Sequence, residues 1–199
     1  MMEKRAQMTI FVIVAIVIVA LLGLYFVIRG GIGIEGVPSE LRPVFDYYES
    51  CIKDESEVAI KLAGTQGGYV NVPDYISGSE YAPFSSQLNF LGFPVPYWSY
   101  VSGNGLIKEQ VPSKRDIERN IGDYIEERIK ECDFDSYYSQ GYEIEIEEPR
   151  VNVNINENNV RINADSRLSV SKAGTKGNRQ EHNIVISSKF GRFYDLARK

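Results

Sequence analysis

An uncharged apolar run near the N-terminus constrains this chain more than any other feature. No charged side chain occurs from Ala6 to Ile28, and apolar residues fall on every face of a helix drawn through the run. At about 1.5 Å per residue, such a helix crosses a hydrocarbon layer of roughly 30 Å. A core helix of a soluble protein would show a polar face instead. The run therefore predicts a membrane-spanning helix, and we assign residues 1–29 as an N-terminal membrane anchor.

The charged residues beside this run predict its orientation. Lys4 and Arg5 precede it, and Arg29 stands alone before a Gly-rich stretch. Basic residues favour the cytoplasmic side, which places the N-terminus in the cytoplasm. The predicted localisation is therefore the cell membrane, with a single pass and an extracellular C-terminal domain, and the N-terminal helix has the lipid bilayer as its partner.

Glycines follow the run at a spacing that also occurs in dinucleotide-binding loops. Gly31, Gly33 and Gly36 match GxGxxG, but that fingerprint needs a strand before it and a helix after it. We interpret residues 30–38 as a Gly-rich hinge. Residues 39–199 are then long enough for one domain, which we expect to be an extracytoplasmic α+β domain.

The charge balance excludes one class of partner. Residues 1–30 hold three of the 22 basic and one of the 27 acidic side chains, so the remainder carries a formal charge of −7. An acidic surface repels the phosphates of nucleic acid. We therefore expect no nucleic-acid partner.

Apolar residues recur at helical spacing in two later segments. The first covers residues 38–68, with Ser39 as the candidate N-cap and three glycines at its end. The second covers residues 111–135, where Ser113 and Asp116 have the spacing of a capping box. Each segment predicts an amphipathic helix with one face toward a core.

The two cysteines, Cys51 and Cys132, lie on the apolar faces of these two helices. An even cysteine count in a region predicted to be exported is typical of a disulfide. Two buried free thiols are the alternative. We predict a Cys51–Cys132 bond, which would stabilise the fold by at most about 4–5 kcal/mol because it closes a loop of about 80 residues.

After the second helix the apolar period changes from helical to two, which is typical of strands with one buried face. This alternation predicts four strands, around residues 142–146, 151–155, 160–170 and 184–186, with a longer loop at 172–180. Residues 191–199 resemble the first turns of a further helix. The predicted fold class is α+β: an N-terminal transmembrane helix, then two packed helices that cover one face of a mostly antiparallel four-stranded sheet.

Side chains that support catalysis or bind metals are sparse. His182 is the single histidine, and a Ser/His/Asp or Cys/His mechanism or a zinc site needs further such groups. We interpret His182 as an exposed or hydrogen-bonded strand residue. The sequence predicts no catalytic, cofactor-binding or metal-binding residues, no cofactor, and a protein that is not an enzyme.

The segment between the two helices is the strongest candidate for a contact surface. Nine of the 23 aromatic residues fall between Tyr69 and Tyr100. Loop aromatics can contact glycans, peptides or other subunits, and Tyr97, Trp98 and Tyr100 are the residues that we select for this role. The alternative is that they cover the helical core, because a long loop needs apolar anchors of its own.

The stretch KRAQMTIF at residues 4–11 resembles the signal of archaeal type IV pilins, in which a short basic start precedes an apolar helix. The resemblance covers about 25 residues and implies processing between Ala6 and Gln7. Phe11 stands where pilins usually carry Glu at the fifth mature position. The start of the chain and the stretches GGY, PYW and INENNV are also similar to single-pass surface proteins of small-genome archaea.

Together, these features predict a membrane-anchored extracytoplasmic protein of the cell envelope that is non-enzymatic and used in attachment or surface assembly. Besides the bilayer, its candidate partners are identical subunits, another surface protein or a glycan. Two alternatives stay open. One is a type IV pilin-like filament subunit processed between Ala6 and Gln7, and the other is an envelope hydrolase that uses carboxylates in a cleft beneath the aromatic segment.

Overall fold

The computed structural model describes residues 17–19, 37–80 and 84–199. The chain divides into two compact units, Met1–Gly36 and Val37–Lys199. In the first unit only residues 17–19 are described, and they are helical. The predicted hinge, residues 30–38, lies outside the described residues except for its last two positions.

The predicted membrane-spanning helix requires a correction. Within residues 17–19, 37–80 and 84–199, no helix has both the length and the apolar character needed to cross a membrane. The longest of them, α2 (Arg42–Thr65), is long enough but carries charged side chains along its exposed face. The predictions of a single-pass membrane protein and of an extracellular C-terminal domain are therefore not supported. Most of the predicted anchor lies outside the described residues.

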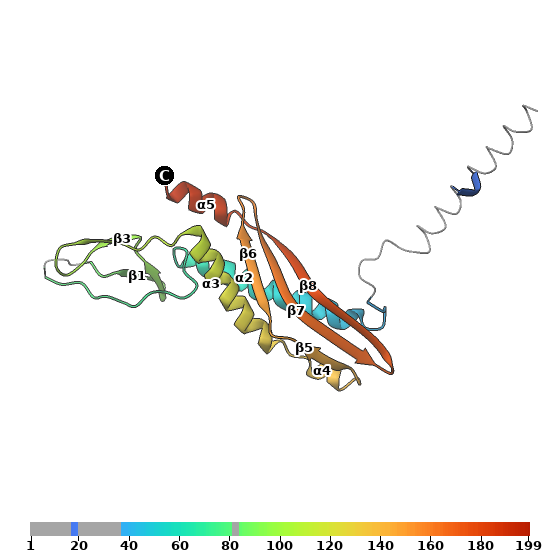
Figure 1. Ribbon diagram of the computed structural model, residues 1–199. Helices are drawn as coiled ribbons and strands as arrows, with labels where there is room; N and C mark the ends of the chain where they lie inside the picture. The colour runs from blue at the N-terminus through green and yellow to red at the C-terminus, as the bar shows by residue number, and fades with distance from the viewer. Residues whose placement is uncertain (1–16, 20–36, 81–83) are drawn as a thin grey trace, which may run out of the picture. The chain divides into compact units, whose positions relative to one another are not determined.

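Four strands form one antiparallel sheet with β7 at its centre (Figure 1). On one side β8 (Thr175–Ser187) pairs with β7 (Asn159–Lys172) along its length. On the other side β6 (Arg150–Ile155) pairs with the first half of β7, and β5 (Glu143–Ile146) pairs with the second half. Alternate residues of β7 are buried, as the apolar period of two predicted. The α+β class and the mostly antiparallel sheet are confirmed.

Two helices cover the apolar face of this sheet. α2 packs on β7 and β8, and α3 (Lys114–Arg128) packs on β6 and on α2. Ser113 and Asp116 form the predicted capping box at the start of α3. Both helices bury a stripe of residues spaced three or four apart, which is the pattern that an amphipathic helix needs. The stripe consists of Val44, Phe45, Tyr48, Ile52, Ser56, Ala59, Ile60 and Ala63 on α2, and of Ile117, Ile121, Gly122 and Ile125 on α3.

α3 also satisfies the outer edge of β6. Glu126 Oε1 accepts a hydrogen bond from Val151 N at 2.6 Å, and Glu118 Oε1 accepts one from Ile155 N at 2.9 Å. Eight residues of helix and four of strand both span about 12–13 Å, so the two acceptors match the two donors. Two amides that this strand edge would otherwise leave free are thereby paired.

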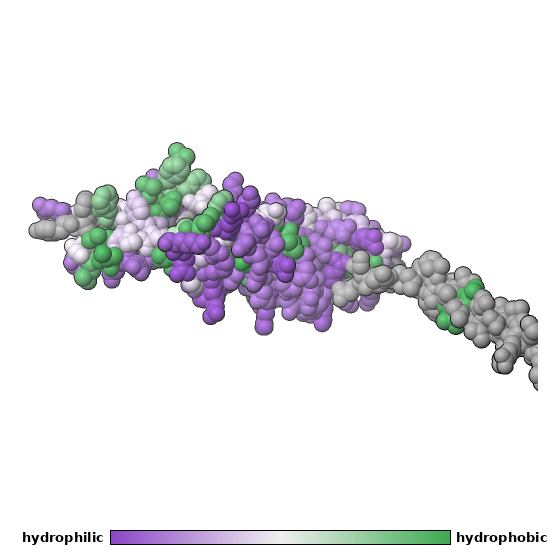
Figure 2. Space-filling view, turned by 90° about the horizontal axis from the view of Figure 1, so that it is seen from above, coloured by the Kyte–Doolittle hydropathy of each residue, from purple (hydrophilic) through white to green (hydrophobic). Residues whose placement is uncertain are grey.

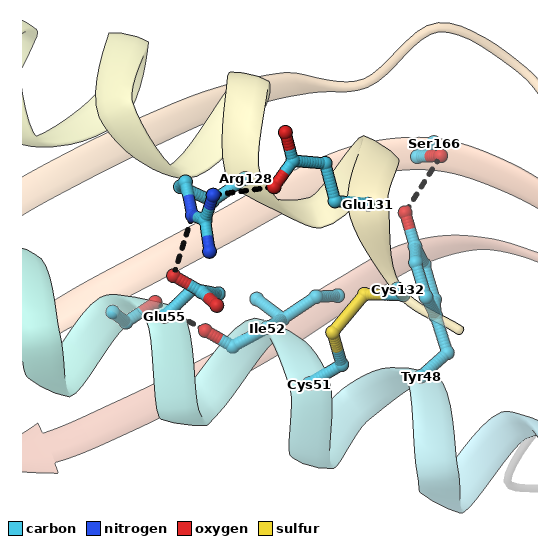
Figure 3. Close-up of a disulfide and its surroundings, with 9 residues drawn as sticks. Tyr48, Cys51, Ile52, Glu55, Arg128, Glu131, Cys132 and Ser166 are labelled. Carbon is cyan, nitrogen blue, oxygen red and sulfur yellow. Dashed lines mark hydrogen bonds and ion pairs between the residues drawn. A yellow bond between two sulfur atoms is a disulfide. The ribbon is translucent and has the colours of Figure 1, made fainter.

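The predicted Cys51–Cys132 disulfide is present and joins α2 to the residue that follows the 3-10 turn η1 (Ile129–Glu131). Side chains around it join α2 to α3, η1 and β7 (Figure 3). Arg128 bridges Glu55 and Glu131, and the hydroxyl of Tyr48 donates to Ser166 Oγ at 3.1 Å. Because the bond joins residues 81 positions apart, everything between the two helices lies inside the loop that it closes.

Two short hairpins that the sequence analysis did not predict occupy the segment between α2 and α3. β1 (Gln87–Phe90) pairs with β2 (Phe93–Pro96), and β3 (Ser99–Val101) pairs with β4 (Ile107–Glu109). The fold therefore contains one four-stranded sheet and two small two-stranded sheets among the described residues. β2 contains Pro94 and Pro96, which the edge strand of a hairpin tolerates.

Helix and strand boundaries differ from the predicted ones in two places. α2 begins at Arg42 rather than after Ser39, because residues 38–41 form a turn in which the amides of Leu41 and Arg42 donate to Pro38 O. Residues 172–180 form no long loop, since β7 and β8 continue to a two-residue turn at 173–174. On β8, Gly177 occupies a position that faces the core. A Cβ at this position would lie 3.1 Å from Pro38 and 3.2 Å from Leu41, so little room is left for a side chain.

The remaining elements are short. α4 (Asp135–Tyr138) lies between η1 and β5, and α5 (Phe190–Ala197) follows β8. α5 confirms the helix predicted at the end of the chain. Its buried residue Tyr194 donates from its hydroxyl to Pro112 O at 2.9 Å and so holds the helix near the start of α3.

Candidate functional site: the hairpin lobe

Residues 69–80 and 84–111, which we call the hairpin lobe, differ in surface from the rest of the unit. In the described part of the unit, 12 of the 18 large apolar residues that are exposed fall between Tyr75 and Val111. No charged residue occurs from position 81 to 107. Figure 2 shows hydrophobic residues gathered at this end, while most of the remaining surface in view is hydrophilic. A contiguous exposed apolar surface is a frequent mark of an interaction site.

One buried node holds the two hairpins together. Ser86 is 1 % exposed, and its amide donates to Ile76 O while its carbonyl accepts from Tyr97 N. The side-chain amide of Gln110 donates to Ser86 O at 3.0 Å and to Tyr97 O at 2.7 Å. These bonds join the segment before the first hairpin to the link between the hairpins. The lobe therefore has a polar scaffold although its outer surface is apolar.

Two neighbouring hollows on the lobe, which we call the aromatic groove, share Phe84 and Tyr97. Their volumes are about 460 and 340 Å³, within the usual range of ligand pockets, roughly 300–1,000 Å³. No charged side chain lines either hollow. The first is lined by Tyr75, Phe84, Ser85, Gln87, Leu88, Asn89, Pro94 and Tyr97, and the second by Phe84, Tyr97, Ser99, Tyr100, Val101 and Ile107.

The three aromatic residues selected from the sequence lie in two different environments. Tyr97 is exposed and lines both hollows of the aromatic groove, and Tyr100 lines the second. Trp98 points the other way: its Nε1 donates to Gly67 O at 2.7 Å, and its ring packs edge-on against Tyr194. Trp98 therefore fastens the lobe to the helices, which corresponds to the alternative role of covering the core.

Sequence reasoning missed the most exposed apolar residues of the lobe. Phe84, Leu91 and Ile107 are 71, 84 and 72 % exposed. Two signals in the sequence pointed to them: the uncharged stretch at 81–107, and a Leu-Gly pair between two short apolar runs, which is the length of a hairpin turn. Composition had drawn attention to Tyr and Trp instead, because these residues are enriched in binding sites.

His182 lies on β8 as expected and is fully buried beneath α2, so of the two expected states it is hydrogen-bonded, through one ring nitrogen, and not exposed. Its Nε2 lies 3.2 Å from Ser166 O, and its Nδ1 has no hydrogen-bond partner and lies 3.6 Å from Glu49 Oε1. Arg179 forms an ion pair with the same carboxylate. Burial lowers the pKa of His182, with a further lowering by Arg179, while Glu49 and the Ser166 carbonyl act in the opposite direction.

Acidic side chains near β5 are engaged with neighbours on the surface. Lys130 pairs with Glu148 and Arg167 with Glu147, and Ser171 Oγ donates to Glu143 at 2.7 Å. No group of three or more His, Cys, Asp or Glu residues that could hold a metal ion occurs within the described ranges.

The predicted processing site at Ala6 and Gln7 lies outside the described residues. No protein-family model, curated protein or solved structure matches this chain.

Proposed function

We propose that this chain is a non-enzymatic binding protein that acts in attachment or assembly, and that the hairpin lobe is its contact surface. The observation that carries the proposal is the concentration of exposed apolar side chains on a lobe without charge between residues 81 and 107. Apolar surface in water is unfavourable by about 25 cal/mol per Å², so a partner that removes it from water gains binding free energy.

The construction of the lobe supports a binding role over simple core cover. In the described chain, Val70 is the only residue of the lobe among the 24 buried apolar residues, although Trp98 packs against them. The other large apolar residues of the lobe thus contribute little to the core. The node at Ser86 and Gln110 fixes the hairpins before a partner arrives, which lowers the entropy lost on binding.

Site-specific photo-cross-linking tests this proposal in cells that make the protein. A photo-reactive phenylalanine analogue is placed at Phe84 in the aromatic groove, and at Tyr138 on α4 as an aromatic control that is 49 % exposed. We expect cross-linked products of defined mass from the Phe84 position and few from the Tyr138 position. Equal yields at both positions, or no product at either, would contradict the proposal.

A further inference from the structure

The hairpin lobe carries a convex apolar feature beside the concave aromatic groove. We call residues 90–93, which form the end of the first hairpin, the apolar tip. Phe90, Leu91 and Phe93 are 58, 84 and 52 % exposed, and Gly92 completes the turn. The identity of the lobe's partner, inferred from this tip and the groove, rests on the proposed function of the lobe.

The backbone of the apolar tip is one that leucine rarely adopts. Leu91 has φ +51° and Gly92 has φ +87°, so both central residues of this two-residue turn are left-handed. Such a turn strongly prefers Asn, Asp or Gly at its first central position. The side chain of Asn89 holds the turn by accepting from Gly92 N at 3.0 Å. A leucine here strains the backbone and gains almost no contact within its own chain, since it is 84 % exposed.

The aromatic groove has the complementary character. Phe84 and Tyr97 line both of its hollows. Tyr75 lines the first hollow and Ile107 the second, and these side chains are 65 and 72 % exposed. The groove offers aromatic faces and aliphatic groups without a charge to select a charged ligand. Leucine and phenylalanine side chains are the groups that such a groove binds best.

The charge distribution favours association of two copies of this chain through the lobe and disfavours association through their other surfaces. Residues 37–199 carry 19 basic and 25 acidic side chains, a formal charge of −6. Two copies therefore repel each other when their charged surfaces approach. This repulsion is weakest at the uncharged stretch of the lobe, because two lobes can approach each other there without bringing charged side chains together.

The exposed area is sufficient for such a contact. Twelve lobe residues that are 36–84 % exposed, each with roughly 150–250 Å² of surface, leave on the order of 1,000 Å² accessible. A standard interface removes about 800 Å² from each partner. We propose that the apolar tip of one copy inserts into the aromatic groove of a second copy, with Leu91 as the central side chain of the contact.

Sedimentation velocity of the purified full-length chain over a concentration series tests this contact. Leu91→Asn removes the apolar side chain and suits the left-handed turn, so the variant keeps or raises the melting temperature of the fold. We expect self-association to weaken at least tenfold in Leu91→Asn and in the groove variant Phe84→Ser. Val185→Asn on β8 replaces a residue that is 62 % exposed outside the lobe and should associate as the unchanged chain does.

A double variant and a mixture make the test specific. Because both substitutions remove the same contact, Leu91→Asn combined with Phe84→Ser should associate no more weakly than the weaker single variant. A mixture of the two single variants should regain association, since one retains the groove and the other the tip. Because each variant in the mixture keeps only one half of the contact, the mixed species should stop at two copies. In the unchanged chain, species that stop at two copies indicate reciprocal contacts and longer species indicate head-to-tail contacts, and both agree with the inference.

Three results would overturn the inference: a monomeric unchanged chain at all concentrations, a Leu91→Asn variant that associates normally, or a mixture that regains nothing. These results leave the proposed function intact if photo-cross-linking at Phe84 still captures a different protein. Loss of cross-linking at Phe84 as well would overturn both.

Discussion

The helix–sheet body, residues 37–68 and 112–199, and the hairpin lobe place their apolar side chains in opposite ways. Among the described residues of the second unit, the body supplies all but one of the 24 buried apolar residues, and the lobe supplies 12 of the 18 exposed large apolar ones. The body excludes water from its core and carries its charges outside. The lobe is stabilised by backbone and amide hydrogen bonds and leaves its aromatic and aliphatic groups accessible.

This difference indicates that the body supplies the stability of the unit, while the lobe supplies its exposed apolar surface. A two-stranded hairpin is marginally stable in water by itself. The lobe contains two of them and depends on its attachment to α2 and α3, through Trp98 and through the loop that the Cys51–Cys132 bond closes. Changes in the body should therefore affect both regions, whereas changes on the outer lobe should affect binding alone.

Removal of the disulfide should have the largest effect. Replacing Cys51 and Cys132 with alanine releases a loop of about 80 residues and should lower the free energy of unfolding by up to about 4 kcal/mol. For a unit of this size the melting temperature should fall by about 10 °C. Differential scanning calorimetry of the oxidised chain and the variant measures both quantities. Reduction of the unchanged chain serves as the control, and an unchanged melting temperature in both would refute the assigned role.

Loss of the Trp98 hydrogen bond should loosen the attachment of the lobe to the body, and it should reduce stability less than loss of the disulfide does. Trp98→Phe keeps a ring against Tyr194 but leaves Gly67 O without its donor, which should destabilise the attachment by about 1–2 kcal/mol. We expect faster cleavage by protease within the lobe and unchanged protection of the sheet. Val185→Ser on β8, which is 62 % exposed and lies away from Trp98, should leave the cleavage pattern unaltered. Uniform acceleration across the unit would show that the lobe and the body unfold together.

A change in pH should act on the body and spare the lobe. Burial lowers the pKa of His182, so the unfolded chain binds a proton more readily than the folded one near its ordinary value of about 6.5. The contribution of neutral His182 to stability is present above pH 6.5 and decreases as the pH falls toward the lowered value. Glu49, Tyr48 and Arg179 are the ionisable groups around the ring.

Urea midpoints between pH 7.5 and 5.5 measure this dependence. The unchanged chain should lose stability on acidification, and His182→Gln should show a flatter profile because Gln does not titrate. The comparison uses the slopes, so a lower overall stability of His182→Gln does not interfere with it. Parallel profiles would mean that His182 is not the group responsible.

Much of the helix–sheet body could be predicted from the sequence, and the reason lies in its regular periods. Helical spacing located α2 and α3, alternation located the four strands, and the meeting of Cys51 and Cys132 followed from their places on two apolar faces. Where the inward position of a strand is a glycine, as at Gly177, the alternation vanishes. The extension of β7 and β8 was missed for that reason.

The hairpin lobe could not be derived in this way, because strands of three or four residues are too short to show a period. Its turn at Leu91 also lacks the Asn or Asp that usually identifies a hairpin of this kind. His182 was placed on the correct strand, but its burial depends on contacts with Glu49 and Tyr48 from a distant helix. The predicted role of the N-terminal run as a membrane span found no support among the described helices.

The prolines of β2 have a consequence for how far association through the lobe can proceed. Phe90 and Phe93 close the two-residue turn, so Leu88 and Val95 form the next pair that exchanges hydrogen bonds, and Pro94 and Pro96 occupy positions whose amides would point away from β1. Proline has no N–H group to offer there. An apolar hairpin with a free edge would otherwise accept further strands and so start a fibril. The prolines at the outer edge of β2 prevent the addition of a strand there, while the side chains of the hairpin remain exposed for contact.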